Sequence, residues 1–206
     1  MRPARLALMG GTFDPPHVGH LLAASDACDL LGLDRLVFVP AGQQPLKRHR
    51  EAAPADHRLR MVQLMAEGDG RFSVDEMEIR RTGLSFTVDT LEEYARRFPD
   101  SERFVLLGVD AFTLLDQWRD AARVVSLAHL VVLTRQAEPG VVDTEAVTQQ
   151  VQSIGGANAA TPLAIPSRRV DVSSTEIRTR VKDGRPIRGF VTDAVARYIE
   201  LNGLYR

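Results

Sequence analysis

The sequence predicts an α/β fold in which a parallel sheet is flanked by helices, and two observations predict it. Short apolar runs that end in glycine or proline indicate buried strands. Segments with apolar residues at helical spacing alternate with these runs, and such alternation is typical of a parallel sheet. The 206 residues are enough for one sizeable core, and no internal repeat interrupts them, so we expect a single domain over residues 1–206.

The predicted strands and helices follow one another along the whole chain. Strands are predicted from their apolar runs at 6–9, 35–40, 72–75, 103–107 and 129–133, and an extended segment is predicted at 162–172. Helices are predicted from their apolar sides at 17–31, 57–66, 85–97, 111–115, 121–127, 144–153 and 193–201, with another one opening at 173. Asp56 and Thr87 stand where a polar side chain would cap a helix. Residues 76–81 are charged, and no element is predicted there.

The composition favours small-molecule partners. Lys and Arg number 26 against 27 Asp and Glu, which leaves a formal charge of −1 and gives no bias toward nucleic acid or a membrane. We therefore expect small molecules or other copies of the chain as partners. Cys28, the only cysteine, has no partner for an internal disulfide and is expected to fill the core in a reducing compartment. No apolar run of about 18 residues occurs, which favours a cytoplasmic protein without a membrane segment.

The chain is organised around residues 10–20, Gly-Gly-Thr-Phe-Asp-Pro-Pro-His-Val-Gly-His, which follow the first predicted strand. The two glycines let backbone N–H groups approach a ligand that a Cβ would hold off. The prolines delay the helix until His17, and a helix N-terminus attracts phosphate. On that helix, His17 and His20 would share a face that points at the anion.

Three interpretations of the two histidines compete. They are a structural pair, a metal pair, or donors to the negative charge that builds up on a phosphoryl oxygen. No third His or Cys ligand stands at a plausible local spacing for a metal. The strand, turn and helix around the pair favour the phosphate interpretation.

Other polar residues follow the predicted strands, where open α/β sheets place their ligands. The loop 41–55 carries the basic cluster Lys-Arg-His-Arg, which is either a solvated loop or a flap over phosphates. Asp110, next to Gly108, suits either ribose hydroxyls or a helix cap. Trp118 is a core anchor or a platform for a planar ring, and Arg135 is a charge at a strand end.

Residues 173–178, Ser-Ser-Thr-Glu-Ile-Arg, have the form of a capping box that opens a helix. Hydroxyls at a helix start make a second anion site, with Arg178 one turn inside the helix. Most sequences of this form are helix caps and nothing more, so both interpretations stay open at this point.

Two of these stretches resemble known signatures. Residues 10–20 resemble the nucleotidyltransferase signature G-x-F-x-P-x-H-x-G-H, and residues 173–178 resemble the S-S-T-x-I-R signature that accompanies it in adenylyltransferases. From Met9 to Tyr205 the chain resembles the bacterial nicotinate mononucleotide adenylyltransferases, and the other stretches that carry the resemblance are 85–91 around Thr87, 108–110, Trp118 and 198–205. The resemblance implies a Rossmann-like nucleotidyltransferase fold.

The resemblance also implies roles for residues of this chain. Those implied to bind ATP are Gly10, Gly11, Thr12, Phe13, His17, His20, Gly108, Asp110, Arg135, Ser174, Thr175 and Arg178. Those implied to bind nicotinate mononucleotide are Thr12, Phe13, Lys47, Thr87, Asp110 and Trp118. A catalytic role is implied for His17, His20, Lys47 and Arg178. The flap departs from the family, which often has P-P-H-K where this chain has Gln-Pro-Leu-Lys at 44–47, so the resemblance implies no histidine contact at Leu46.

The implied reaction is adenylyl transfer in NAD biosynthesis, in which the phosphate of nicotinate mononucleotide attacks the α-phosphorus of ATP to give deamido-NAD and pyrophosphate. Mg²⁺ would be held mainly by the ATP phosphates and water, because the sequence offers no dedicated carboxylate cage. The alternatives are a sibling transferase acting on phosphopantetheine or on a cytidyl nucleotide, a silent nucleotide-binding module, and a tRNA-charging enzyme. Intact His17, His20 and Arg178 argue against the silent module, and the lack of a basic face argues against the tRNA-charging enzyme.

Overall fold

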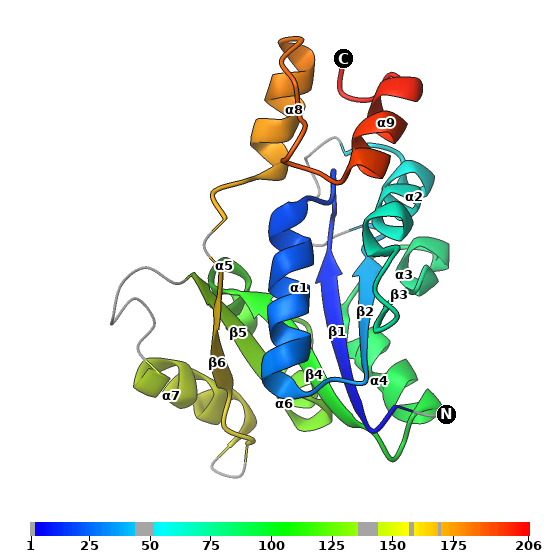
Figure 1. Ribbon diagram of the computed structural model, residues 1–206. Coiled ribbons are helices and arrows are strands. Elements are labelled where there is room, and N and C mark those ends of the chain that lie inside the picture. The colour runs from blue at the N-terminus through cyan, green and yellow to red at the C-terminus, as the bar shows by residue number, and fades with distance from the viewer. Residues whose placement is uncertain (1–2, 44–51, 136–143, 157–158, 169) are drawn as a thin grey trace.

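A computed structural model describes residues 3–43, 52–135, 144–156, 159–168 and 170–206, and a six-stranded sheet forms its centre (Figure 1). The strands are β1 (Arg5–Gly11), β2 (Arg35–Pro40), β3 (Phe72–Val74), β4 (Glu102–Gly108), β5 (His129–Arg135) and β6 (Leu163–Ser167). Neighbouring strands all pair in parallel, in the order β3-β2-β1-β4-β5-β6. The predicted parallel sheet is confirmed, and the strand order reverses its direction between β1 and β4.

Helices connect the strands and cover both faces of the sheet. In the described ranges they are α1 (Val18–Leu31), α2 (Ala55–Ala66), α3 (Met77–Arg80), α4 (Thr87–Arg97), α5 (Val109–Phe112), α6 (Ala121–Leu127), α7 (Thr144–Gly155), α8 (Ser174–Lys182) and α9 (Asp193–Leu201), with a short 3₁₀ helix at Leu115–Gln117. In Figure 1, α1 lies in front of the sheet and α4 behind it, whereas α8 and α9 extend beyond the carboxyl end of β1. None of the helices in these ranges is both long and apolar enough to cross a membrane.

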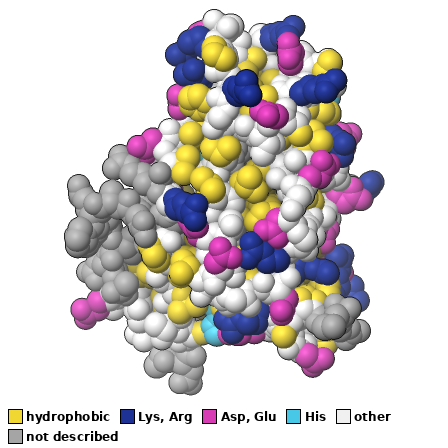
Figure 2. Space-filling view, in the orientation of Figure 1, with side chains coloured by type: hydrophobic (Ala, Val, Ile, Leu, Met, Phe, Trp, Pro, Cys, Tyr) yellow, Lys and Arg dark blue, Asp and Glu magenta, His cyan; other side chains and the backbone are white. Residues whose placement is uncertain are grey.

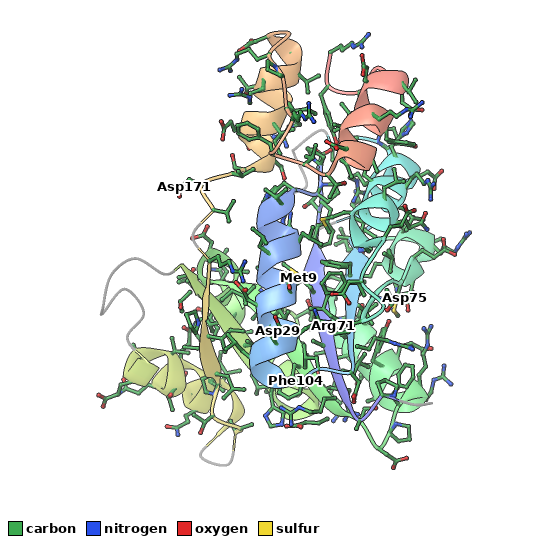
Figure 3. All side chains as sticks on the ribbon, in the orientation of Figure 1. Met9, Asp29, Arg71, Asp75, Phe104 and Asp171 are labelled. Atoms are coloured by element: carbon green, nitrogen blue, oxygen red, sulfur yellow. The ribbon has the colours of Figure 1, made fainter. Side chains whose placement is uncertain are left out.

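The two faces of the sheet build two hydrophobic cores, because successive side chains of a strand point to opposite faces. Ala7 and Met9 of β1 pack in one core with residues of α1, α2, α8 and α9, and Met9 lies beside α1 in Figure 3. Leu6 and Leu8 pack in the other core with residues of α4, α6 and α7. Cys28 is buried in the first core, as predicted. Burial on both faces explains why the strands were recognisable as continuous apolar runs.

The predicted helix caps at Asp56 and Thr87 are wrong, and so is the cap alternative for Asp110, because each of these residues lies in the first turn of its helix. α2 begins at Ala55, so Asp56 lies inside the first turn. α4 begins at Thr87 itself. α5 begins at Val109, which places Asp110 in the first turn rather than at a cap. Acidic side chains are also favoured in the first turn of a helix, so the sequence alone does not separate the two positions.

Helix α3 was not predicted, because a single turn is too short to show a period. It starts where the backbone N–H of Met77 donates to Oδ1 of Asp75 at 2.9 Å. Oδ2 of Asp75 accepts from the hydroxyl of Tyr94 at 2.8 Å and from Nη1 of Arg97 at 2.9 Å. These two donors belong to α4, so one carboxylate fixes α3 against α4.

Candidate active site

The carboxyl ends of β1 and β4 form an open floor where the strand order reverses. Gly10 and Gly108 stand at these ends, and both are exposed. A Cβ at either position would meet no described atom within 4 Å, so a ligand above this floor would contact the backbone directly. Open α/β sheets bind ligands outside the carboxyl ends of their strands at such a reversal, which makes this edge the candidate site.

The loop after β1 turns at Phe13, whose φ is 50°. Its buried ring meets the ring of His20 edge-on, with 5.0 Å between the centroids. Gly11 makes room for this ring, because a Cβ at position 11 would lie 3.0 to 3.2 Å from its atoms. The Phe13 side chain therefore supports His20 from within the protein.

The two histidines lie against each other at the start of α1, with 3.7 Å between their ring centroids. His17 is the N-cap residue, so the predicted start of this helix is confirmed. Its backbone N–H donates to Nδ1 of His20 at 3.2 Å. Because Nδ1 accepts, the proton of a neutral His20 sits on Nε2, which is then the donor of the ring.

The His17 ring leaves one nitrogen without a partner. Its Nδ1 is buried and has no hydrogen-bond partner within the described ranges. Gly19 permits this ring position, because a Cβ there would lie 3.0 Å from Nδ1 and from Cε1 of His17. Buried nitrogens of this kind are usually satisfied, and the group nearest to this one is the first turn of α1, where His17 and His20 form a capping-box arrangement.

Both imidazoles are neutral near pH 7. Burial lowers the pKa of His17 from 6.5 to about 4. Burial, with a smaller effect of the neighbouring His17, lowers the pKa of His20 from 6.5 to about 3. Hydrogen bonds from these rings to a phosphoryl oxygen would therefore come from neutral donors.

We expect the NMR signals of these two rings to show no titration near pH 6.5 in the ligand-free protein. Both pKa values lie below the ordinary 6.5, so the unfolded chain takes up protons first as the pH falls. The two histidines thus lower the free energy of unfolding progressively as the pH falls from 6.5, down to about 4 for His17 and about 3 for His20, and have no such effect above that window.

The measurement is a pH titration of the imidazole C–H signals, and the variants His17→Asn and His20→Asn assign them. An inflection near pH 6.5 in either signal would contradict the neutral pair.

Asp14, inside the signature loop, is buried and receives hydrogen bonds from distant parts of the chain. Its Oδ1 accepts from the hydroxyl of Tyr205 at 2.7 Å and from the N–H of Ala53 at 3.1 Å. Nη1 of Arg178 donates to its backbone oxygen at 2.7 Å and lies 3.6 Å from Oδ2. Burial and the Asp14 charge raise the pKa of Tyr205, which keeps its hydroxyl a donor. The sequence analysis missed this role of Asp14. The available signal was its position, because a carboxylate inside an anion-binding loop needs hydrogen-bond donors that neutralise its charge.

Arg58 of α2 is the second residue that the sequence analysis missed. It is 3% exposed, and among the described residues its guanidinium donates only to backbone carbonyls. The accepting oxygens belong to Thr12 (2.9 Å), Ala41 (2.7 Å), Gly42 (3.2 Å) and Ala53 (3.0 Å). It thus ties the signature loop to the described residues on both sides of 44–51. The available signal was an arginine in the apolar stripe that continues with Met61, Val62 and Met65.

The second motif docks onto the signature loop. Ser173 caps α8 by accepting a backbone N–H at 3.1 Å, so the predicted cap is confirmed. The hydroxyl of Ser174 donates to the backbone oxygen of Pro15 at 2.8 Å, and Nη2 of Arg178 donates to Oγ1 of Thr175 at 3.2 Å. The start of α8 and the two histidines are therefore held on the same loop.

One amide expected at the anion site is engaged elsewhere. The N–H of Val18, the first residue of α1, donates to the backbone oxygen of Phe190 at 3.0 Å. A phosphate at this helix start would therefore depend on the imidazoles and on the glycine-rich backbone.

The other predicted site residues take no part in the loop contacts given above. Thr87 and Trp118 are half-buried, and Trp118 packs against the second core. Asp110 is exposed in the first turn of α5, which directly follows β4. Lys47 lies outside the described residues, and so does the side chain of Arg135, the last residue of β5.

The donor set of the site suits phosphates better than a bare metal ion. In the described ranges, no three His, Cys, Asp or Glu side chains are grouped to hold a metal. The carboxylate of Asp14 already accepts from Tyr205 and Ala53. With these residues, a divalent cation would be bound mainly by the phosphates of a substrate and not by a protein site of its own.

Comparisons with known proteins agree along the whole chain. The cytidylyltransferase-like family matches residues 8–180. A probable nicotinate-nucleotide adenylyltransferase of Gemmatimonas aurantiaca is 50% identical over 206 residues, covering 98% of this chain and 92% of that protein. One of Thermus thermophilus is 44% identical over 202 residues and covers 98% of this chain and 100% of that protein. The Plasmodium falciparum nicotinic acid mononucleotide adenylyltransferase complexed with NaAD superimposes with a TM-score of 0.77 at 16% identity, covering 98% of this chain and 97% of its own, and supports the Rossmann-like nucleotidyltransferase fold.

Proposed function

Because the chain belongs to the nicotinate-nucleotide adenylyltransferases, we propose that its signature loop, its two histidines and the start of α8 hold the phosphates of ATP during adenylyl transfer. The enzyme transfers the adenylyl group of ATP to nicotinate mononucleotide, which forms nicotinate adenine dinucleotide and releases pyrophosphate. The residue roles that follow are our assignment.

The chemistry requires positioning and charge stabilisation rather than a protein nucleophile. A phosphate oxygen of nicotinate mononucleotide attacks the α-phosphorus of ATP and forms the new P–O bond. The bond between the α-phosphorus and the bridging oxygen breaks, and its electron pair leaves with pyrophosphate. One observation carries the assignment of His20: its Nδ1 accepts from His17, so Nε2 is fixed as a donor before any substrate arrives. A preset donor stabilises developing charge without reorganisation.

The remaining roles extend along the same edge of the sheet. We assign the phosphates of ATP also to the residues Gly10, Gly11, Thr12, Phe13, Ser174, Thr175 and Arg178, and the nucleoside side to Gly108, Asp110 and Arg135. We assign Thr12, Phe13, Lys47 and Asp110 to nicotinate mononucleotide as well. Thr87 and Trp118 would receive the nicotinate ring and its carboxylate. Arg178 keeps 21% of its side chain exposed while it holds Asp14, which supports a phosphate contact from its free side.

Nucleotidyltransferases of this kind use a divalent metal, and we propose Mg²⁺ for this chain. When bound, it would neutralise charge on the phosphates of ATP. The chain's own contribution is to hold those phosphates with neutral imidazoles and backbone groups.

The test is pyrophosphate release from purified protein with MgATP and three acceptors in parallel, namely nicotinate mononucleotide, its amide analogue and phosphopantetheine. We expect strong preference for the nicotinate acid. Preference for the amide would keep the chemistry and overturn the carboxylate pocket around Thr87. Turnover of phosphopantetheine alone would identify the chain as a sibling transferase. ATP binding without any turnover would support a nucleotide-binding module without catalytic activity.

We propose other copies of the chain, rather than nucleic acid, as its macromolecular partners. The formal charge of −1 gives no attraction for a polyanion. Hydrophobic side chains gather in the middle of the face that carries α1 (Figure 2), and a second copy would cover such a surface.

A further inference from the structure

Glu78 of α3 is a buried carboxylate that the reaction described above does not use. It is 8% exposed, and burial raises its pKa. The hydroxyl of Thr90, in α4, donates to its Oε1 at 2.6 Å. The hydroxyl of Ser85 also acts on this carboxyl group and lowers its pKa against the larger effect of burial. Buried carboxylates are costly unless they are paired in this way, so the arrangement calls for a reason.

Ser85 also contacts the segment that follows β2. Its Oγ accepts from the backbone N–H of Gly42 at 3.1 Å, and its own N–H donates to the backbone oxygen of Gln43 at 2.9 Å. Gly42 also packs directly on α3, because a Cβ there would lie 2.4 Å from the backbone oxygen of Glu78. Three segments that are separate in the sequence thus meet at one carboxylate.

The side chain of Glu78 acts as an acceptor at Oε1, where the hydroxyl of Thr90 donates. The Ser85 oxygen accepts from the backbone N–H of Gly42, which leaves its own hydroxyl proton for the carboxyl group of Glu78. A glutamine at position 78 would bring two donors of its own. One of the hydroxyls would then lose its acceptor, or the Ser85 oxygen would turn away from Gly42.

The start of α4 depends on these contacts, because it lacks the usual cap. Its N-cap residue is Phe86, which offers no side-chain oxygen to the first amides. α3 itself is fixed against α4 by Asp75, which is labelled beside α3 in Figure 3. Glu78 therefore lies on a rigid support and holds the residue that precedes Phe86 and Thr87.

We propose that Glu78 is a positioning residue for nicotinate mononucleotide, which acts through Thr90 and Ser85 to fix the start of α4 where Thr87 lies. The proposal rests on the proposed function, since it takes Thr87 as a contact of the nicotinate group. Glu78 does not touch the substrate, and its role is to set the place of a residue that does.

The experiment compares Glu78→Gln with wild type in the steady-state KM for each substrate and in the Tm. We expect KM for nicotinate mononucleotide to rise about tenfold, the scale for a misplaced positioning group, while KM for ATP stays within about twofold. Ser85→Ala should act in the same direction, and it replaces Glu78→Gln if that variant does not fold. The matched control is Glu92→Gln, an exposed carboxylate of α4 that pairs with Arg123 at 3.2 Å, which should leave both KM values unchanged.

A purely structural role would lower Tm and leave both KM values of the folded enzyme unchanged, or would move them together, and either result overturns the proposal. Thr87→Val separates this failure from that of the proposed function. If Thr87→Val raises KM for nicotinate mononucleotide and Glu78→Gln does not, the positioning role fails alone. If wild-type protein does not turn over nicotinate mononucleotide, the proposed function fails first.

Discussion

Replacing His20 by alanine is expected to lower kcat by on the order of a hundredfold or more, the usual scale for losing one donor to developing charge. The variant loses the only N–H that this side chain offers, because Nδ1 of His20 is engaged as an acceptor by the backbone of His17. It also removes the ring against which Phe13 and His17 are packed. Because the donor acts on charge that exists only in the transition state, kcat and kcat/KM should fall by similar factors.

The measurement is steady-state pyrophosphate release with nicotinate mononucleotide as acceptor. His129→Ala is the matched control, because that histidine begins β5 at the opposite end of the sheet, where its Nε2 lies 3.5 Å from Glu102. The control should keep wild-type kcat. A His20→Ala variant within threefold of wild type would rule out the assigned role.

Replacing Arg58 by alanine is expected to cause a large loss of stability, about 3–5 kcal/mol of the free energy of unfolding, as for other broken buried charge networks. The change removes the donors of four backbone carbonyls and leaves them facing a cavity. It also removes a positive charge near the buried carboxylate of Asp14, which raises the pKa of Arg58 against the effect of burial. Arg58→Lys should lie in between, because an ammonium has fewer donors and no fork geometry.

Urea unfolding followed by the fluorescence of Trp118, the only tryptophan, measures the change. Arg60→Ala tests the same helix at an exposed position, where the side chain reaches Gln63 at 3.4 Å, and should cost within about 0.5 kcal/mol. Equal stability of the two variants would contradict the role of Arg58.

The sequence was informative where local chemistry decides the structure. β2 was predicted with its observed bounds, because an apolar run that ends at Pro40 has few alternatives. The start of α1 followed from the prolines before His17, and the cap of α8 from the spacing of Ser173 and Glu176. α3 was missed because one turn shows no period.

The supporting contacts of the site were not predictable, because they join residues that are remote in the sequence. Tyr205 reaches Asp14 across a separation of 191 residues, and Arg178 reaches the same residue across 164. No pattern in the neighbouring sequence indicates such partners. The signature identified the loop and its histidines, whereas the donors that hold the loop in place came only from the fold.

The contact between Tyr205 and Asp14 makes the support of the site depend on the C-terminal segment. Segments of a protein open locally with free energies far below that of global unfolding. When residues 202–206 detach, Asp14 loses a donor to its buried carboxylate while the sheet remains intact. Local opening of this short segment would therefore weaken the support of the signature loop without unfolding the sheet.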